Sequence, residues 1–148
     1  MAGIYVSGGT YSGSGDVTTD WVRIESTSPS SVFIAPDGTL TLTLDTNDPA
    51  TGERALYNNG TFTHNSGTVY VNVSTSAATY AKLDARASYY NVIIKNDGSD
   101  TNRVQMDNTA ASIANDLTIE QGSLETYNSS GRHLTVGHIA IIESGGTI

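Results

Sequence analysis

Residues 115–148 read NDLTIEQGSLETYNSSGRHLTVGHIAIIESGGTI, and this stretch decides the fold. Its apolar pieces, LTI, SLET, LTV and IAII, are each too short for a helix, and Gly, Asn, Ser and Gln separate them. Short strands with turn residues at even spacing are typical of an all-β chain. The near-repetition of DLTIE, HLTVG and HIAIIE indicates that one structural unit is repeated.

The same short strands are predicted further back in the chain. The segment TLTLTL at residues 39–44 alternates, which places Leu40, Leu42 and Leu44 on one face of a strand and the threonines on the other. Other apolar runs predict strands at residues 4–6, 21–25, 32–34, 61–63, 67–73, 89–95 and 103–106. The segment AKLDARA at 81–87 is the one place where a short helix is considered, and the Gly- and Ser-rich residues after the first strand suggest a loop or an assembly arm.

One apolar position per strand recurs with a drifting period. The first series is Leu42, Val69, Val92, Leu117 and Ile139, and the second is Phe62, Leu83, Val104, Leu124 and Ile148; Ile113 and Leu134 begin a third. Two or three short strands per period predict a parallel β-solenoid, in which like strands of successive coils stack about 4.8 Å apart. The alternative is an antiparallel β-sandwich or jelly roll, whose strands also recur every 8 to 12 residues or so.

Composition limits the partners that we expect. The 148 residues carry a formal net charge of −8, and the seven Lys and Arg are scattered singly along the sequence. Nucleic acids and anionic membrane surfaces need clustered positive charge, so neither is predicted as a partner. No Cys is present, which excludes disulfides and Cys-based zinc sites. There is no apolar run of the roughly 20 residues that cross a membrane, so membrane insertion is not predicted.

Four segments resemble right-handed parallel β-helix repeats: ALYNNGTFTHNSGTVYVN (55–72), YYNVIIKN (89–96), NDLTIEQGSLET (115–126) and HLTVGHIAIIESGGTI (133–148). Such repeats occur in bacterial adhesins and autotransporter passengers, and in tail-fibre, tailspike and virion-surface proteins of phages. The resemblance covers residues 38–148 and implies a short parallel β-helix, with residues 1–37 as an N-terminal cap or attachment segment.

The resemblance also implies a function. It points to a non-enzymatic structural or interaction protein of a virion, such as a phage tail, fibre or capsid-decoration component, that assembles with other subunits as a homo-oligomer. The alternatives are a carbohydrate-binding or lyase-like β-helix module and a fragment of a bacterial surface adhesin. The start MAGIYVSGGT does not resemble a signal peptide. The expected location is therefore the virion, with the cell surface as the alternative.

Candidate metal ligands have a simpler explanation as turn residues. Asp45, Asn47, Asp48 and Glu53 could supply oxygen ligands to calcium, but Ala50 stands where an EF-hand loop needs Gly. Residues 97–100, DGSD, are typical of a turn. The three histidines are His64, His133 and His138; His133 and His138 flank LTVG and could form a two-His metal pair, but no third ligand is evident. We predict neither a metal nor a cofactor.

Catalytic candidates are few. Glycoside hydrolysis needs two carboxylates at a defined separation. Glu120, Glu125 and Glu143, or Asp84 with Arg86, are the candidates, yet no spacing pairs them recognisably. No G-x-S-x-G motif occurs. No catalytic residue is therefore predicted, and we do not expect an enzyme.

Two sets of residues are candidates for contacts. Aromatic side chains can stack on sugar rings of a cell-surface glycan or face another subunit; the candidates are Trp21, Tyr57, Tyr70, Tyr80, Tyr89, Tyr90 and Tyr127. The strand pattern continues to Ile148 without a polar capping repeat, and solenoids need their ends covered. We therefore expect end-to-end contact through Ile139, Ile141, Ile142 and Ile148. Ile119 and Ile141 are predicted to point into the core.

Overall fold

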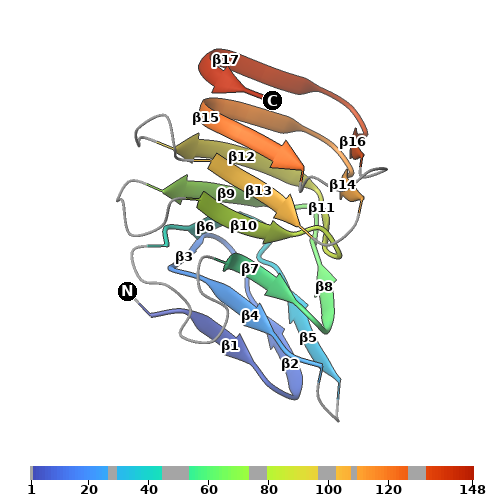
Figure 1. Ribbon diagram of the computed structural model, residues 1–148. Coiled ribbons are helices and arrows are strands. Elements are labelled where there is room, and N and C mark those ends of the chain that lie inside the picture. The colour runs from blue at the N-terminus through green and yellow to red at the C-terminus, as the bar shows by residue number, and fades with distance from the viewer. Residues whose placement is uncertain are drawn as a thin grey trace.

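The computed structural model describes residues 2–26, 30–44, 54–73, 80–96, 103–107, 110–126 and 133–148. These residues form an all-β parallel solenoid of about five turns, so the predicted fold class is confirmed and the sandwich alternative is not needed. The chain rises coil by coil from its first strands at the base to its last strand at the top (Figure 1). Among the described residues there is no long apolar helix of the kind that crosses a membrane.

The strands are short, and each coil contributes three of them. In chain order they are β1 (Ile4–Val6), β2 (Gly9–Ser12), β3 (Val17–Thr19), β4 (Val22–Ile24), β5 (Ser31–Ile34), β6 (Thr39–Leu42), β7 (Arg54–Asn58), β8 (Thr61–Thr63), β9 (Thr68–Val73), β10 (Tyr80–Asp84), β11 (Ser88–Tyr89), β12 (Asn91–Asn96), β13 (Arg103–Asp107), β14 (Ala111–Ile113), β15 (Leu117–Thr126), β16 (Leu134–Val136) and β17 (Ala140–Thr147).

Like strands of successive coils pair in parallel on three faces. The front sheet contains β1, β4, β7, β10, β13 and residues 123–126 of β15. The rear sheet contains β3, β6, β9, β12, residues 117–121 of β15, and residues 140–142 of β17. The side face carries two sheets, β2-β5-β8 and β11-β14-β16. Figure 1 shows the front and rear sheets as two layers, with the side strands along one edge.

The front and rear sheets become continuous near the top. β15 runs through ten residues and belongs to both sheets, and Gly122 lies at the bend with φ of 86°. A positive φ of this size costs glycine little because glycine has no Cβ. Because of this bend, β15 passes from the rear sheet into the front sheet as one continuous strand, whereas in the lower coils separate strands belong to the two sheets.

The predicted alternation in residues 39–44 is confirmed, because Leu40, Leu42 and Leu44 are fully buried. Inward positions of neighbouring coils stack into aliphatic ladders. One ladder of the rear sheet runs through Leu42, Val71, Ile94 and Ile119, all of them at most 1% exposed. Burial of such side chains is the main source of stability in the solenoid.

The register differs in places from the predicted series. Val69, Val92 and Leu117 pair as predicted, but Leu40 lies below Val69, and Ala140 lies above Leu117. In the second series only Val104 and Leu124 are paired in the predicted register. Leu40 lies two residues from the predicted Leu42, and a strand that slips by two residues keeps its inward and outward faces, so alternation alone leaves this shift undetermined. The change from Ile139 to Ala140 is a slip of one residue, which exchanges the inward and outward faces of that strand.

The remaining members of the series also change partners. Phe62 belongs to the side face, where it pairs with Phe33, and Val104 pairs with Ala81 instead of Leu83. Ile113 and Leu134 share a side sheet as expected, but Leu134 pairs with Ala111. Ile148 follows the last residue of β17.

Aromatic rings fill the side of the core. Tyr11 stacks on Phe33 with ring centroids 4.8 Å apart, and Phe33 lies 5.9 Å from Phe62. Phe62 in turn lies 5.5 Å from Tyr89, so the aromatic ladder bridges the two side sheets. Ile113 continues it above Tyr89 in the next coil.

Two local predictions are wrong. Residues 80–84 form β10 and not a helix, because Ala81 and Leu83 are buried while Lys82 points outward, as a strand requires. The Gly- and Ser-rich stretch after the first strand contains β2, which pairs in parallel with β5. Packing against neighbouring coils thus overrides the helix propensity of Ala and Lys.

The coils also begin before residue 38. Strands β1 to β5 lie within residues 4–34 and join the same parallel sheets as the later strands. The likeness to the repeat therefore extends structurally into the first 37 residues. A cap or attachment role for this segment remains a prediction.

Glycines let consecutive coils approach at one corner. A Cβ on Gly38 would lie 2.6 Å from the carbonyl oxygen of Gly15, and one on Gly67 would lie 2.7 Å from that of Gly38 and 2.1 Å from that of Pro36. Real Cβ atoms do not come this close to backbone oxygen, so each of these two positions requires glycine.

Candidate functional site

Positively charged side chains gather on one face, although they are scattered in the sequence. Five of the seven Lys and Arg lie on the front sheet or directly at its edge: Arg23, Arg54, Lys82, Arg86 and Arg103. Their neighbours in the strands, such as Val22, Ala55 and Ala81, are buried, so the charged side chains occupy the outward positions. The front sheet is thus enriched in cationic side chains, although the chain as a whole is acidic.

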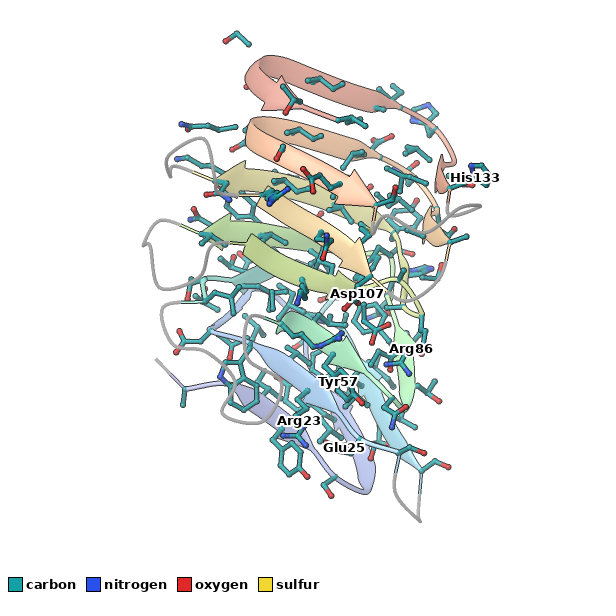
Figure 2. The ribbon with its side chains drawn as sticks, viewed as in Figure 1. Arg23, Glu25, Tyr57, Arg86, Asp107 and His133 are labelled. Carbon is teal, nitrogen blue, oxygen red and sulfur yellow. The ribbon has the colours of Figure 1, made fainter. Side chains whose placement is uncertain are left out.

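Tyrosines alternate with these arginines along the solenoid axis. Arg23 pairs in register with Tyr5 in the coil below and with Tyr57 in the coil above. The Arg23 guanidinium lies 5.2 Å from the Tyr5 ring centroid. Arg54 and Arg86 lie 5.4 and 5.5 Å from the Tyr57 ring centroid. Figure 2 shows Arg23, Tyr57 and Arg86 on this face of the molecule. We call Tyr5, Arg23, Tyr57 and Arg86 the front row.

Arg86 is held by a buried carboxylate. Its Nε donates to Oδ1 of Asp84 at 2.9 Å, and its Nη2 donates to Oδ2 at 2.6 Å. Asp84 is fully buried, and its carboxylate also accepts hydrogen bonds from the backbone N–H groups of Asn58 and Arg86. The third guanidinium nitrogen donates to the side-chain oxygen of Asn59 at 3.1 Å. The head group of Arg86 is therefore fixed in one orientation.

Arg54 has a similar support in the next coil. Its Nη1 lies 2.6 Å from Oδ2 of Asp107, which is 6% exposed. Asp84 and Asp107 are register partners at the ends of β10 and β13. The two carboxylates that neutralise Arg54 and Arg86 thus lie beneath the surface, while the guanidinium groups flank Tyr57 above them.

The two neighbouring carboxylates have opposite pKa shifts. Burial alone would raise the pKa of Asp84, but hydrogen bonds from Arg86 and from the Asn58 backbone outweigh it and hold the pKa below its usual value. Burial raises the pKa of Asp107, Arg54 opposes this, and the negative charge of Asp84 adds to it. In an active site, two carboxylates whose pKa values are shifted in opposite directions can serve as general acid and general base. Here both carboxylates are buried, so their evident role is to orient the two arginines.

Two further ion pairs complete this face. Arg23 pairs with Glu25 two residues along the chain. Arg103 donates from Nη1 to both carboxylate oxygens of Glu125, each at 3.1 Å. Arg103 and Glu125 also line a hollow of about 730 Å³ near the last coil, together with Gln105, Leu124, Thr126, His133, Leu134 and Ile148.

The predicted catalytic candidates are not brought together. Asp84 and Arg86 do pair, as their spacing allows, but the carboxylate is buried. Glu125 is bound to Arg103, and the hydroxyl of Tyr70 donates to Glu120 at 3.4 Å on the rear sheet. Glu143 is exposed on β17.

The histidines likewise occupy separate environments. Nδ1 of His64 accepts a hydrogen bond from the Ser66 backbone at 2.9 Å, and its ring stacks on Tyr90 at 5.3 Å. His138 Nδ1 lies 2.7 Å from Asp116 Oδ1, while His133 lines the hollow. Within the described ranges no group of three or more His, Asp or Glu side chains could hold a metal ion. The calcium candidates at 45–53 and the turn at 97–100 lie outside the described residues.

The aromatic candidates divide into several environments. Tyr57 and Tyr70 point outward from the front and rear sheets, as a contact role needs, and Tyr90 stacks on His64. Trp21 packs against the core, and its ring covers the position where a Cβ on Gly3 would lie. Tyr127 and the Tyr80 side chain lie outside the described part of the structure.

Tyr89 is unsuited to a contact role. It is fully buried, and its hydroxyl donates to the backbone oxygen of Asp84 at 2.8 Å. The reason is local: the backbone turns between β11 and β12, which sends Tyr89 inward and leaves its neighbour Tyr90 half-buried outside.

The four isoleucines of the last coil are exposed. Ile139, Ile141, Ile142 and Ile148 have exposed fractions between 44% and 66%. Ile142 stacks above Ile119 and therefore continues the inward ladder. Ile141 stacks above Thr118 on the outer face of the rear sheet, so its predicted inward orientation is wrong, whereas that of Ile119 is confirmed.

Sequence reasoning singles out Tyr57, Arg86 and Asp84 on this face, although not as one site. It does not indicate Tyr5, Arg23, Arg54 or Asp107, which lie in different coils. The available signal was the outward position of each residue in a short alternating strand. It becomes informative only when the register that stacks these positions is known.

Comparison with known proteins returned no match: no family model, no curated protein and no solved structure is detectably similar to this chain.

Proposed function

We propose that the protein is a non-enzymatic structural component of a virion, in the tail, a fibre or the capsid surface, and that it assembles with further copies of itself. The observation that carries this proposal is the patch of exposed isoleucines on the last coil, Ile139, Ile141, Ile142 and Ile148. Among the described residues the only other large hydrophobic side chain that is clearly exposed is Tyr5. Concentration of exposed apolar area in one place marks an interaction surface.

The patch extends over two surfaces. Ile142 continues the core ladder above Ile119, so an added coil would bury it. Ile141 instead lies on the outer rear face, where Thr118 and Ile93 precede it in register. A partner that covers Ile141 must therefore approach from the side of the solenoid. Assembly through this lateral surface would not depend on a further coil above β17.

The first test is the mass of the 148-residue chain in solution by light scattering. We expect a homo-oligomer, and we expect Ile141→Lys to dissociate it because a lysine would place charge in an apolar interface. Thr18→Lys is the matched control, since Thr18 is exposed on β3 of the same rear sheet. A stable monomer, or equal effects of the two variants, would contradict the proposed assembly.

The second test concerns location. Peptides of this protein should be found by mass spectrometry in purified virions, at a constant ratio to the major capsid protein. Recovery only from the soluble fraction or the cell envelope would argue against a virion component while leaving the assembly result unaffected.

A further inference from the structure

We propose that the front row binds an acidic polysaccharide, an extended chain with one carboxylate or sulfate group in each repeat unit. This site lies on the front sheet and is independent of the isoleucine patch. The geometry points to it through two tyrosine–arginine pairs, Tyr5 with Arg23 and Tyr57 with Arg86.

The two pairs are spaced regularly along the axis. Tyr5, Arg23 and Tyr57 occupy the same register position in three successive coils. Adjacent strands lie about 4.8 Å apart, so the two tyrosines are separated by about 9.6 Å. This separation is close to the length of two sugars in an extended polysaccharide. Every second sugar can therefore contact a tyrosine, and the acid group of each repeat can contact an arginine.

The side chains suit these two contacts. Tyrosine rings present an apolar surface to the C–H groups of a sugar ring and a hydroxyl to its polar groups. Guanidinium groups form paired hydrogen bonds with carboxylate and sulfate oxygens. Arg86 uses Nε and Nη2 for Asp84, Nη1 for Asn59, and a further hydrogen bond for the Tyr57 side chain, which leaves one of its five N–H groups for a ligand.

The buried carboxylate of Asp84 makes the site suited to an anion. Asp84 neutralises Arg86 from below, so a ligand approaching from solvent meets the cationic side of Arg86 first. Arg23 is instead paired with Glu25, whose side chain is 18% exposed, so a ligand there meets an ion pair. Because Asp84 already fixes Arg86, binding costs little side-chain entropy at that position. The spacing is too wide for consecutive stacked bases, which lie about 3.4 Å apart, so a nucleic acid fits this row poorly.

The test is affinity electrophoresis of the 148-residue chain in native gels. The gels contain polygalacturonate for the carboxylate, chondroitin sulfate for the sulfate, or dextran as a neutral polymer. We expect retardation by at least one acidic polymer and none by dextran, and the two acidic gels distinguish the groups. A competing single-stranded oligonucleotide should not release the protein.

The variants isolate the row. Arg23→Gln and Tyr57→Ala should each weaken retardation about tenfold. Lys95→Gln and Tyr70→Ala are the matched controls, because they remove the same residue types or charge from the outer rear sheet. They should bind as the unmodified protein does. Far-ultraviolet circular dichroism shows whether each variant is folded.

Three outcomes would overturn the proposal: no retardation by either acidic polymer, equal losses in the row and control variants, or release by the oligonucleotide. Failure of this test leaves the mass and location measurements unaffected, because none of the row residues belongs to the isoleucine patch.

Discussion

The carboxylate of Asp84 lies beneath the front sheet and accepts hydrogen bonds from Nε and Nη2 of Arg86, at 2.9 and 2.6 Å. Asp84 is fully buried, whereas the side chain of Arg86 is 36% exposed. The pair thus joins the interior of the solenoid to its surface. The ion pair of Arg103 and Glu125 lies on the same sheet but is exposed on both sides, which makes it a natural control.

Replacing Asp84 by Ala should lower the free energy of unfolding by about 2 to 4 kcal/mol, because Arg86 and the Asn58 backbone lose their acceptor in a buried place. Glu125→Ala should change it by at most about 1 kcal/mol, since exposed pairs contribute little. Urea denaturation of both variants provides the measurement. Comparable losses would show that burial of Asp84 does not determine its contribution.

The stabilisation by Asp84 should depend on pH. Its pKa is lowered in the folded protein from an ordinary value of 3.8. Its ionised form therefore stabilises the fold fully at pH values above 3.8, and this contribution is lost as the pH falls through the lower folded value. The cost of Asp84→Asn should be largest at neutral pH and shrink in acid, as measured by urea denaturation between about pH 7 and pH 3.

Asp107→Asn supplies the contrast. The pKa of Asp107 is raised in the folded protein, so the fold binds its proton more tightly than the unfolded chain does. As the pH falls through the raised value towards 3.8, the parent should gain stability relative to Asp107→Asn. Parallel pH profiles for the two variants would contradict the opposite shifts.

Ile119 and Ile141 should respond very differently to the same substitution. Ile119 is fully buried, and even truncation to Ala costs about 2 to 5 kcal/mol at such a position, so Ile119→Asp should prevent folding. Ile141 is 47% exposed, and Ile141→Asp should shift the melting temperature of the dissociated chain by only a few degrees. Circular dichroism melts at low protein concentration separate this effect from loss of assembly.

Gly67→Ala should destabilise the protein by about 2 kcal/mol or more, because the new methyl group would overlap the backbone oxygen of Pro36. Gly13→Ala is the control: its Cβ would have no neighbour closer than 3.5 Å. The control should remain within about 0.5 kcal/mol of the parent in urea denaturation. Equal stability of both variants would show that the coils can separate at this corner.

Much of the fold could be predicted from the sequence because inward positions repeat within each short strand. Leu40, Leu42 and Leu44 show this most clearly. The repeats do not determine the register, because slipping by two residues preserves the alternation. The sequence pattern therefore pairs Leu42 with Val69, whereas the structure pairs it with Val71. The turn before β12 likewise reverses the two adjacent tyrosines, and no period of two can indicate that Tyr89 is the buried one.

The candidate site was harder to predict than the fold. Arg54 and Asp107 are far apart in sequence, and only stacking of the coils brings them within 2.6 Å. The same holds for Tyr5, Arg23 and Tyr57, each of which is an unremarkable outward residue in its own strand. Sites of this kind arise from the coil-to-coil register, which a single sequence leaves open.

Apart from β15, which joins the front and rear sheets, each described strand of these sheets pairs with the matching strand of a neighbouring coil. The stability of the solenoid is therefore approximately the sum of the contacts within each coil and between neighbouring coils, and does not come from contacts that span the whole molecule. A defect in a middle coil, for example at Ile94, divides the stack into two shorter blocks, each with a newly uncovered end. The same defect in the first or last coil only shortens it. The position of a destabilising substitution along the solenoid axis thus determines how many coils it affects.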